Sequence, residues 1–174
     1  MATKLETERL LLREFTWEDL DFLASLLADP QVMHFWPKPS YDRDEAKAWM
    51  QRTLDRYARD GYGHWLAIEK STGRPVGQVG PLLQEEEGLR FTEVGYIFAT
   101  AAWGKGYATE AAAAVVHWCF ETLGLDRMHA LIRPENTPSQ QVARRLGMRP
   151  GRQVMHGGFV HDLWYVDREA EEQR

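Results

Sequence analysis

The sequence feature that most constrains the fold is a glycine-rich loop that runs directly into an alanine-rich helical pattern. The loop reads Trp103-Gly104-Lys105-Gly106-Tyr107-Ala108-Thr109-Glu110. Behind it, small and apolar residues recur at i, i+3 and i+4 spacing, which predicts a helix with one buried face. The members of this stripe are Ala108, Ala111, Ala112, Val115, Val116, Cys119 and Leu123. Gly124 predicts the end of the helix.

The glycines of this loop indicate a phosphate-binding turn. Glycine at positions 104 and 106 lets the backbone curl, so that its N–H groups and those of the new helix face one point. The positive end of the helix dipole strengthens such a site. A P-loop is excluded because it needs four residues between its glycines, followed by Gly-Lys-Ser/Thr. A dinucleotide fingerprint is excluded because Thr109 stands where a third Gly or Ala is needed, and because Asp126 precedes its strand. A glycine turn that merely starts a helix stays open as the alternative.

Periodic patterns along the rest of the chain predict an α+β fold. Strands are predicted at residues 10–15, 64–69, 75–83, 91–99, 128–133, 152–156 and 160–166. Helices are predicted at about residues 17–29, 44–60, 106–123 and 138–146. The segment at 31–43 has no period and is rich in aromatic residues and proline, which predicts a loop.

Composition limits the class of protein. The length of 174 residues and the 44% of hydrophobic residues suit one domain with a sizeable core. The formal net charge of −5 gives no basic face for nucleic acid, and no nucleic-acid partner is expected. Cys119 is the only cysteine, which excludes an internal disulfide and predicts a reducing compartment. Charges interrupt the short apolar run near the N-terminus, so we expect no signal peptide, no membrane partner and a cytoplasmic location.

Several ordered motifs resemble those of the GNAT superfamily of acyltransferases. The central motif of that family reads Arg/Gln-x-x-Gly-x-Gly/Ala, which Gly106 and Ala108 match, while Trp103 stands in the Arg/Gln position. An aromatic residue before Gly-Lys-Gly-Tyr-Ala-Thr-Glu-Ala looks like the RimJ/RimL-type branch, which acetylates the N-termini of ribosomal proteins. Also similar to that branch are Leu5-Glu6-Thr7-Glu8-Arg9-Leu10 with Leu12-Arg13, Glu93-Val94-Gly95-Tyr96, and Asn136-x-x-Ser139 ending in Leu146-Gly147-Met148. The resemblance covers roughly residues 5–168, which we expect to form one domain.

The resemblance implies the GNAT fold and acetyl-CoA as the co-substrate. In that fold a central mixed, mostly antiparallel sheet of about seven strands is flanked by about four helices. Its fourth and fifth strands, here about 91–99 and 127–133, are parallel and splay apart, and the pantetheine of coenzyme A inserts between them. The coenzyme contacts implied in this way are Ile97, Phe98, Ala99, Trp103, Gly104, Lys105, Gly106, Tyr107, Ala108, Thr109, Asn136 and Ser139.

The implied reaction is direct attack of a neutral primary amine on the thioester of acetyl-CoA, through a tetrahedral intermediate. It needs a route for the ammonium proton, hydrogen bonds to the oxyanion and a proton for the departing thiolate. By resemblance, the backbone N–H of Phe98, or of a neighbour, donates to the oxyanion. For the proton acceptor we favour Glu93, which shares a strand face with Gly95 and Ile97. The alternative is that Glu93 is an ordinary surface glutamate.

The resemblance also indicates the residue that protonates the thiolate. Many members of the superfamily carry a tyrosine seven residues after the asparagine that begins the helix, and here that position is Ala143. The branch that this chain resembles uses a serine three residues after the asparagine, and Ser139 stands there. The alternative is that the Ser139 hydroxyl bonds to helix backbone. Asn136 is predicted both to cap this helix and to contact the coenzyme.

The acceptor amine is not readable from the sequence. By resemblance, the loop between the first two helices and the last hairpin frame it, which makes His34, Phe35, Trp36 and Tyr41 candidate acceptor contacts together with Glu93. The alternative for the loop is a lid packed on the core. The acceptor is expected to be a ribosomal-protein N-terminus or a small molecule, the assembly a monomer or homodimer, and no metal is expected. An alternative function is a CoA-binding regulatory module with weak or no turnover.

Overall fold

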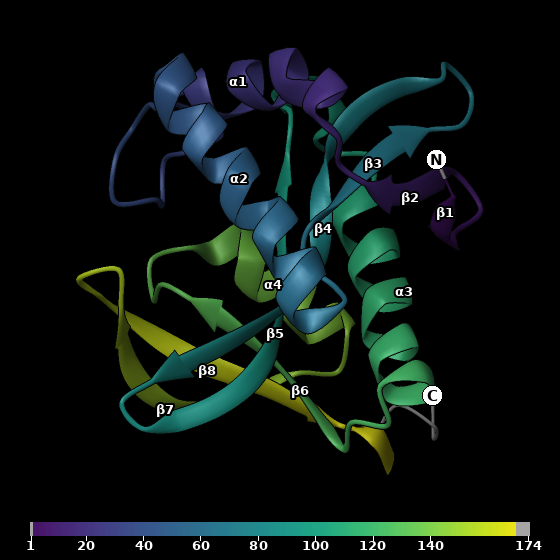
Figure 1. The fold of residues 1–174 in the computed structure, drawn as a ribbon. Helices are drawn as coiled ribbons and strands as arrows, with labels where there is room; N and C mark the ends of the chain where they lie inside the picture. The colour runs from purple at the N-terminus through teal and green to yellow at the C-terminus, as the bar shows by residue number, and fades with distance from the viewer. Residues whose placement is uncertain (1, 170–174) are drawn as a thin grey trace.

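The computed structural model describes residues 2–169, in which eight strands form one mixed sheet (Figure 1). The strands are β1 (Thr3–Glu6), β2 (Leu10–Glu14), β3 (Trp65–Glu69), β4 (Arg74–Glu86), β5 (Leu89–Phe98), β6 (Arg127–Ile132), β7 (Arg149–His156) and β8 (Phe159–Asp167). Their order across the sheet is β1-β2-β3-β4-β5-β6-β8-β7. All neighbouring pairs are antiparallel except β5 with β6, which confirms the mixed, mostly antiparallel sheet.

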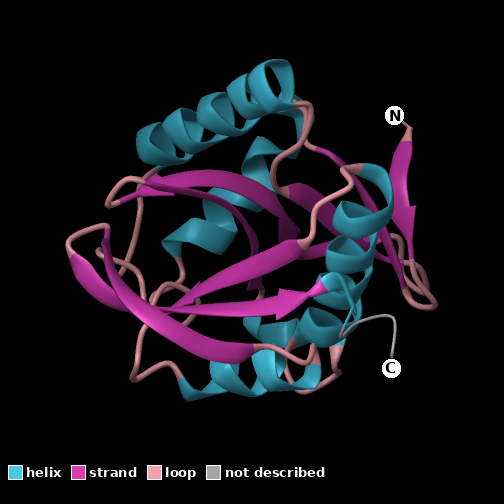
Figure 2. Ribbon diagram, turned by 90° about the horizontal axis from the view of Figure 1, so that it is seen from below, coloured by secondary structure: helices cyan, strands magenta, loops and turns pink. Residues whose placement is uncertain are grey.

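Helices cover both faces of this sheet (Figure 2). The α-helices are α1 (Leu20–Ala28), α2 (Arg43–Asp60), α3 (Tyr107–Thr122) and α4 (Thr137–Arg145). Side chains alternate between the two faces of a strand, and β3 shows the result. Trp65 and Ala67 are buried in a core shared with α3 and α4, whereas Leu66 is buried in a second core shared with α1 and α2. The two cores hold the sheet between two helical layers.

Local sequence explains where the helices begin and end. Asp42 and Glu45 form a reciprocal capping box, in which each carboxylate accepts the backbone N–H of the other residue, and α2 begins directly after Asp42. Gly61 ends α2 in the left-handed conformation, with φ of 81°. The helix predicted behind the glycine loop is α3, whose cap is Gly106.

The parallel strands β5 and β6 diverge almost as soon as they meet. Their register contains a single pair, Glu93 with His129, whereas β5 pairs with β4 along its whole length. The helix α3 connects the two strands. The predicted splay is therefore confirmed, and it opens the sheet next to residues 94–98 of β5.

One strand was missing from the prediction of about seven. β1 is a four-residue edge strand with exposed and half-buried side chains, paired with β2. Its sequence, Thr-Lys-Leu-Glu, carries two charges and no apolar alternation, so nothing in the segment alone separates it from a loop. Within residues 2–169, no helix is long and apolar enough to cross a membrane.

Candidate active site

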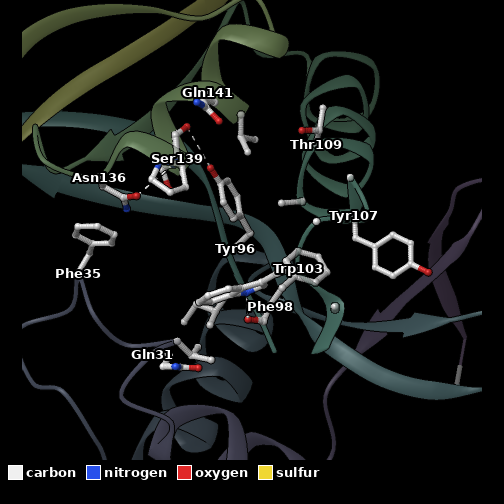
Figure 3. Close-up of a pocket in the computed structure, with 18 of the residues that line it drawn as sticks. Gln31, Phe35, Tyr96, Phe98, Trp103, Tyr107, Thr109, Asn136, Ser139 and Gln141 are labelled. Atoms are coloured by element: carbon white, nitrogen blue, oxygen red, sulfur yellow. Dashed lines mark hydrogen bonds between the residues drawn. The ribbon is translucent and has the colours of Figure 1, made fainter. Parts of the chain in front are cut away.

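A cavity of about 670 Å³ lies between the end of β5, the loop before α3 and the start of α4 (Figure 3). This first cavity brings together residues from Gln31 to Arg145. Most of the predicted coenzyme contacts line it, namely Ile97, Phe98, Trp103, Gly104, Gly106, Tyr107, Ala108, Thr109, Asn136 and Ser139. Ala99 and Lys105 do not line it. The N–H of Ala99 donates to the carbonyl of Val76 on β4. The ammonium group of Lys105 pairs with Glu69 at 3.5 Å.

The glycine loop presents open backbone to the first cavity. Gly104 and Gly106 have φ of 75° and 80°, a conformation that favours glycine. A Cβ on Gly106 would meet only one atom within 4 Å, Nη2 of Arg9 at 3.5 Å. The hydroxyl of Thr109, in the first turn of α3, is buried without a hydrogen-bond partner in the described residues. Open glycine backbone, a helix N-terminus and an orphaned hydroxyl suit a phosphate-bearing ligand such as coenzyme A.

Arg9 holds the glycine loop in place, a role that the sequence did not predict. Its Nη1 donates to the carbonyl of Lys105 at 2.7 Å, and its Nε donates to the carboxylate of Glu110 at 3.1 Å. The guanidinium also lies over the ring of Tyr107, 4.6 Å from the centroid. Arg9 belongs to the N-terminal motif 5–10, so the motif itself was the available clue.

The backbone of β5 faces the first cavity at Phe98. In an antiparallel pair, the N–H and C=O of one residue point to one edge of the strand, and those of the next residue point to the other edge. Ala99 donates to Val76 on the β4 side, so the N–H and C=O of Phe98 face the splay. The indole Nε1 of Trp103 donates to the Phe98 carbonyl at 2.8 Å. The N–H of Phe98 thus has the direction that the predicted oxyanion donor requires.

The start of α4 places Ser139 beside the splay. The Asn136 side chain accepts the N–H of Ser139 at 3.2 Å, which is the predicted cap. The Ser139 side chain interacts with the hydroxyl of Tyr96, and no hydrogen bond from the Ser139 hydroxyl to helix backbone occurs among the described residues. Ala143, at the usual tyrosine position, is buried in the core with 2% of its surface exposed.

Tyr96 is a site residue that the sequence reasoning did not single out. It projects from β5 toward α4, and its hydroxyl donates to the Ser139 carbonyl over 3.5 Å (Figure 3). Burial raises the pKa of Tyr96 to about 12, so the phenol is protonated at neutral pH. Tyr96 is the last residue of the motif Glu93-Val94-Gly95-Tyr96, so that motif was the available sequence clue.

A second cavity, of about 280 Å³, adjoins the first on the side of β6 and β8. Phe35, Trp36, Tyr96, Asn136 and Ser139 line both cavities, so the two cavities meet there. Four of the predicted acceptor contacts line the second cavity, namely Phe35, Trp36, Tyr41 and Glu93. His34 does not line it, because its side chain is exposed and packs edge-on against Phe35.

The aromatic loop both packs on a helix and lines the second cavity. Trp36 and Tyr41 lie against Trp49 of α2, with ring centroids 5.2 and 5.9 Å away. Arg133, directly after β6, donates to the carbonyl of Phe35 at 3.2 Å and fixes the other side of the loop. The packed-lid alternative agrees with these contacts, and contact of the loop with the acceptor stays a prediction.

Glu93 is buried in the second cavity, with 7% of its surface exposed. Its carboxylate accepts hydrogen bonds from Gln84 Nε2 at 2.8 Å and from the N–H of Leu131 at 3.3 Å. Burial raises the pKa of Glu93, and these hydrogen bonds oppose the rise. The surface-glutamate alternative is excluded by this burial. A carboxylate whose pKa is raised by burial is a stronger base than a solvent-exposed one.

A buried histidine behind Glu93 was also not predicted. His64, on the loop before β3, shares a hydrogen bond of 3.0 Å between its Nδ1 and Gln78 Nε2, while its Nε2 has no partner in the described residues. Burial lowers the pKa of His64 to about 3, so the ring is neutral. No sequence motif includes His64. Its contact with Gln78 of β4 forms because β3 pairs with β4.

No group of three or more His, Cys, Asp or Glu side chains in residues 2–169 has a metal-binding arrangement. Cys119 lies on the buried stripe of α3, and burial raises the pKa of its thiol to about 12. It is a core residue without the thiolate character that a nucleophile needs.

The fold is one that acetyltransferases have. A family profile described as "Acetyltransferase (GNAT) domain" matches residues 9–149, and the chain belongs to this family.

Relatives in sequence agree with this assignment. The Bacillus subtilis (strain 168) protein YkkB, whose function is uncharacterized, is 37% identical over 155 residues, which cover 87% of this chain and 88% of YkkB. The uncharacterized N-acetyltransferase p20 of Bacillus licheniformis is 33% identical over 83% of this chain and 82% of its own. The spermidine N(1)-acetyltransferase of Escherichia coli (strain K12) is 27% identical over 86% of this chain and 78% of its own.

Solved structures show the same fold. An acetyltransferase from Agrobacterium tumefaciens str. C58 superposes with a TM-score of 0.82 at 26% identity, covering 97% of this chain and 95% of that one. A ribosomal-protein-S5-alanine acetyltransferase from Vibrio fischeri gives 0.75 at 20% identity, covering 97% and 98%. The aminoglycoside acetyltransferase AAC(6')-Ib in complex with coenzyme A gives 0.77 at 16% identity, covering 94% and 98%. The last two likenesses extend to the fold alone.

Proposed function

We propose that this protein transfers the acetyl group of acetyl-CoA to a primary amine by direct attack. The observation that carries the proposal is the meeting of two cavities at Tyr96, Asn136 and Ser139. One cavity has the glycine loop and the open β5 backbone, and the other has a buried carboxyl group. A bisubstrate acyl transfer needs this separation, with both substrates reaching one point.

Acetyl-CoA would supply the activated acetyl group. The backbone N–H groups around Gly104 and Gly106 would hold its phosphates, and Thr109 offers a hydroxyl donor in the same region. The splayed edge of β5 would receive the extended part of the molecule along residues 97–98. The N–H of Phe98, which faces the splay, would donate to the negative charge that develops on the thioester oxygen.

On the other side of the junction, Glu93 would accept the proton of the incoming amine, directly or through water. Burial raises its pKa, which makes the carboxylate a stronger base than a solvent-exposed glutamate. Ser139 would donate a proton to the departing thiolate and regain one from water, because this residue lines both cavities and its side chain interacts with the Tyr96 hydroxyl. Tyr96 is the other hydroxyl that lines both cavities.

The acceptor is a primary amine, either a protein N-terminal amine as in the RimJ/RimL-type branch or a small-molecule amine. The branch rests on the loop motif at 103–110 and on Asn136-x-x-Ser139. One relative is a spermidine N(1)-acetyltransferase, which supports a small-molecule amine as the second possibility. We further propose that residues 5–168 act as one domain, in the cytoplasm, as a monomer or homodimer.

The test is thiol release from acetyl-CoA with a panel of amines, together with calorimetry of coenzyme A binding. Ser139→Ala should lower kcat by about 10²- to 10⁴-fold with little change in coenzyme affinity. Its pH–rate profile should keep the limb set by amine deprotonation and lose plateau height. Ser25→Ala, an exposed α1 serine that bonds its own helix, is the matched control. Wild-type turnover in Ser139→Ala would remove Ser139 from the mechanism, and binding without turnover for any amine would refute the proposed function.

A further inference from the structure

The second cavity has more fixed positive than negative charge among its lining residues. The Lys and Arg side chains that line it are Arg52 and Arg133, and the lining carboxyl group is Glu93. Glu93 already accepts two hydrogen bonds from the protein and is buried at the base of the cavity. A ligand with several ammonium groups would therefore face two guanidinium groups and one engaged carboxyl group.

Arg52 is held beside the cavity without a carboxylate. It lies on α2, is exposed, and its guanidinium is 5.9 Å from the ring centroid of Trp49. No Asp or Glu of residues 2–169 lies within salt-bridge distance of it. Two other arginines of α2 pair with carboxylates, Arg43 with Asp21 and Arg59 with Asp60, whereas Arg56 donates to the Leu83 carbonyl and does not line the cavity. Arg52 is thus a positively charged residue of α2 that lines the second cavity and has no carboxylate partner among the described residues.

Arg133 is the second cation, and the protein fixes its orientation. Nη1 donates to the Phe35 carbonyl, Nε lies 2.6 Å from the Glu135 carboxylate, and the guanidinium stacks on Phe159 at 4.2 Å from the ring centroid. None of these contacts uses Nη2. A guanidinium fixed in this way can still donate toward a carboxylate in the cavity at little further loss of side-chain entropy.

Two further carboxylates near the cavity already have partners within the protein. Glu86 bonds to Nδ1 of His156 at 2.6 Å, and Glu135 pairs with Arg133. The volume of about 280 Å³ lies just below the usual range for small-molecule sites. The cavity therefore suits a small ligand with one amine and one anionic group.

We propose that the acceptor is a small amine that carries a carboxylate, such as a free amino acid, with the carboxylate at Arg52 and Arg133 and the amine directed to the junction at Ser139. This inference rests on the proposed function and narrows its acceptor. Guanidinium groups bind carboxylates through paired, charge-assisted hydrogen bonds, which would orient the amine at the opposite end of the molecule. Polyamines, aminoglycosides and protein N-termini lack this pairing of one amine with a nearby carboxylate.

The experiment measures thiol release from acetyl-CoA with free L-amino acids, each compared with its own α-carboxamide, and with spermidine and kanamycin. The α-amine of the carboxamide loses its proton more easily than that of the free amino acid. A lower rate with the carboxamide would therefore come from the missing carboxylate. For the best acceptor, kcat/KM of the free acid should exceed that of the amide by about 10- to 100-fold.

Arg52→Gln tests the contact itself, because Arg52 is exposed and its replacement should leave the fold intact. In this variant the acid-to-amide ratio of kcat/KM should fall toward one, as expected when the two changes remove the same interaction. Arg59→Gln, on the same helix but outside the cavity, is the matched control and should keep the ratio.

The outcomes separate this inference from the proposed function. Amides, spermidine or kanamycin accepted as well as free amino acids would overturn the inference alone. An acid-to-amide ratio unchanged in Arg52→Gln, or equally lowered in Arg59→Gln, would also overturn it. Absence of thiol release with every amine, while acetyl-CoA still binds, would refute the proposed function and with it the inference.

Discussion

Gly106 offers the sharpest test of the phosphate site, because the protein side of its environment has room for a side chain. Its φ is 80°, and a Cβ would touch only Arg9 Nη2, at 3.5 Å. Gly106→Ala should therefore cost only the strain of a left-handed alanine, about 1–2 kcal/mol. For a chain of this size that cost corresponds to a fall in Tm of roughly 2–8 °C.

Coenzyme binding should fall by much more than this strain explains. The added methyl group would occupy space beside the N–H groups at the start of α3, where a phosphate must approach the backbone. Loss of one or two charge-assisted hydrogen bonds predicts a Kd for coenzyme A raised about 10- to 100-fold. Isothermal calorimetry measures this Kd, and a thermal melt measures the stability of the same sample.

Gly124→Ala is the matched control for this prediction. Gly124 also has positive φ, 65°, with no atom within 4 Å of a Cβ, and it lies beyond the other end of α3. It should lower Tm by a similar amount and leave coenzyme affinity unchanged. Wild-type coenzyme affinity in a folded Gly106→Ala would refute the phosphate-site assignment, and so would an equal loss of affinity in Gly124→Ala.

Two further predictions concern Glu93 and Arg9. Because burial raises the folded-state pKa of Glu93, the folded state loses stability from this group as pH rises from its unfolded pKa through its folded pKa. Glu93→Gln should therefore gain Tm relative to wild type as pH rises above the unfolded-state pKa of glutamate, while losing kcat. A Tm difference that does not grow with pH would contradict the buried, ionising carboxyl group. Arg9→Gln should raise the Kd for coenzyme A by about 3- to 10-fold, because it removes the hydrogen bond to the Lys105 carbonyl. Arg43→Gln, which removes an exposed ion pair, is the control and should leave this Kd unchanged. Calorimetry of both variants measures the two Kd values.

Much of the fold could be predicted because its patterns are local. The stripe of α3, the capping residues of α2 and the hairpin at Gly157 all depend on residues within a few positions of one another. β1 was missed for the converse reason. Its four residues become a strand only through pairing with β2, which the segment itself does not encode.

The site was predicted best where a continuous motif carries it. The loop at 103–109 and Asn136 with Ser139 line the first cavity, as their motifs indicated. Arg52 and His64 were not predicted, because each lines the second cavity only through the tertiary fold, Arg52 from α2 and His64 from the residue before β3. The assignment of His34 as an acceptor contact is not supported by its position, since sequence proximity to Phe35 says nothing about which way a loop side chain points.

The divergence of β5 from β6 explains why both cavities exist at one place. Backbone N–H and C=O groups inside a protein need partners, and a strand normally finds them on both edges. Beyond the Glu93–His129 pair, β5 has no strand partner on its β6 side within residues 2–169. The indole of Trp103 supplies a donor to the Phe98 carbonyl on that edge. A chain that stops pairing in mid-sheet must offer its backbone to some other group, and here that edge lies between the glycine loop and the buried carboxyl group of Glu93. The same break in pairing thus provides the surface on which an extended coenzyme can bind and the depth at which Glu93 is desolvated.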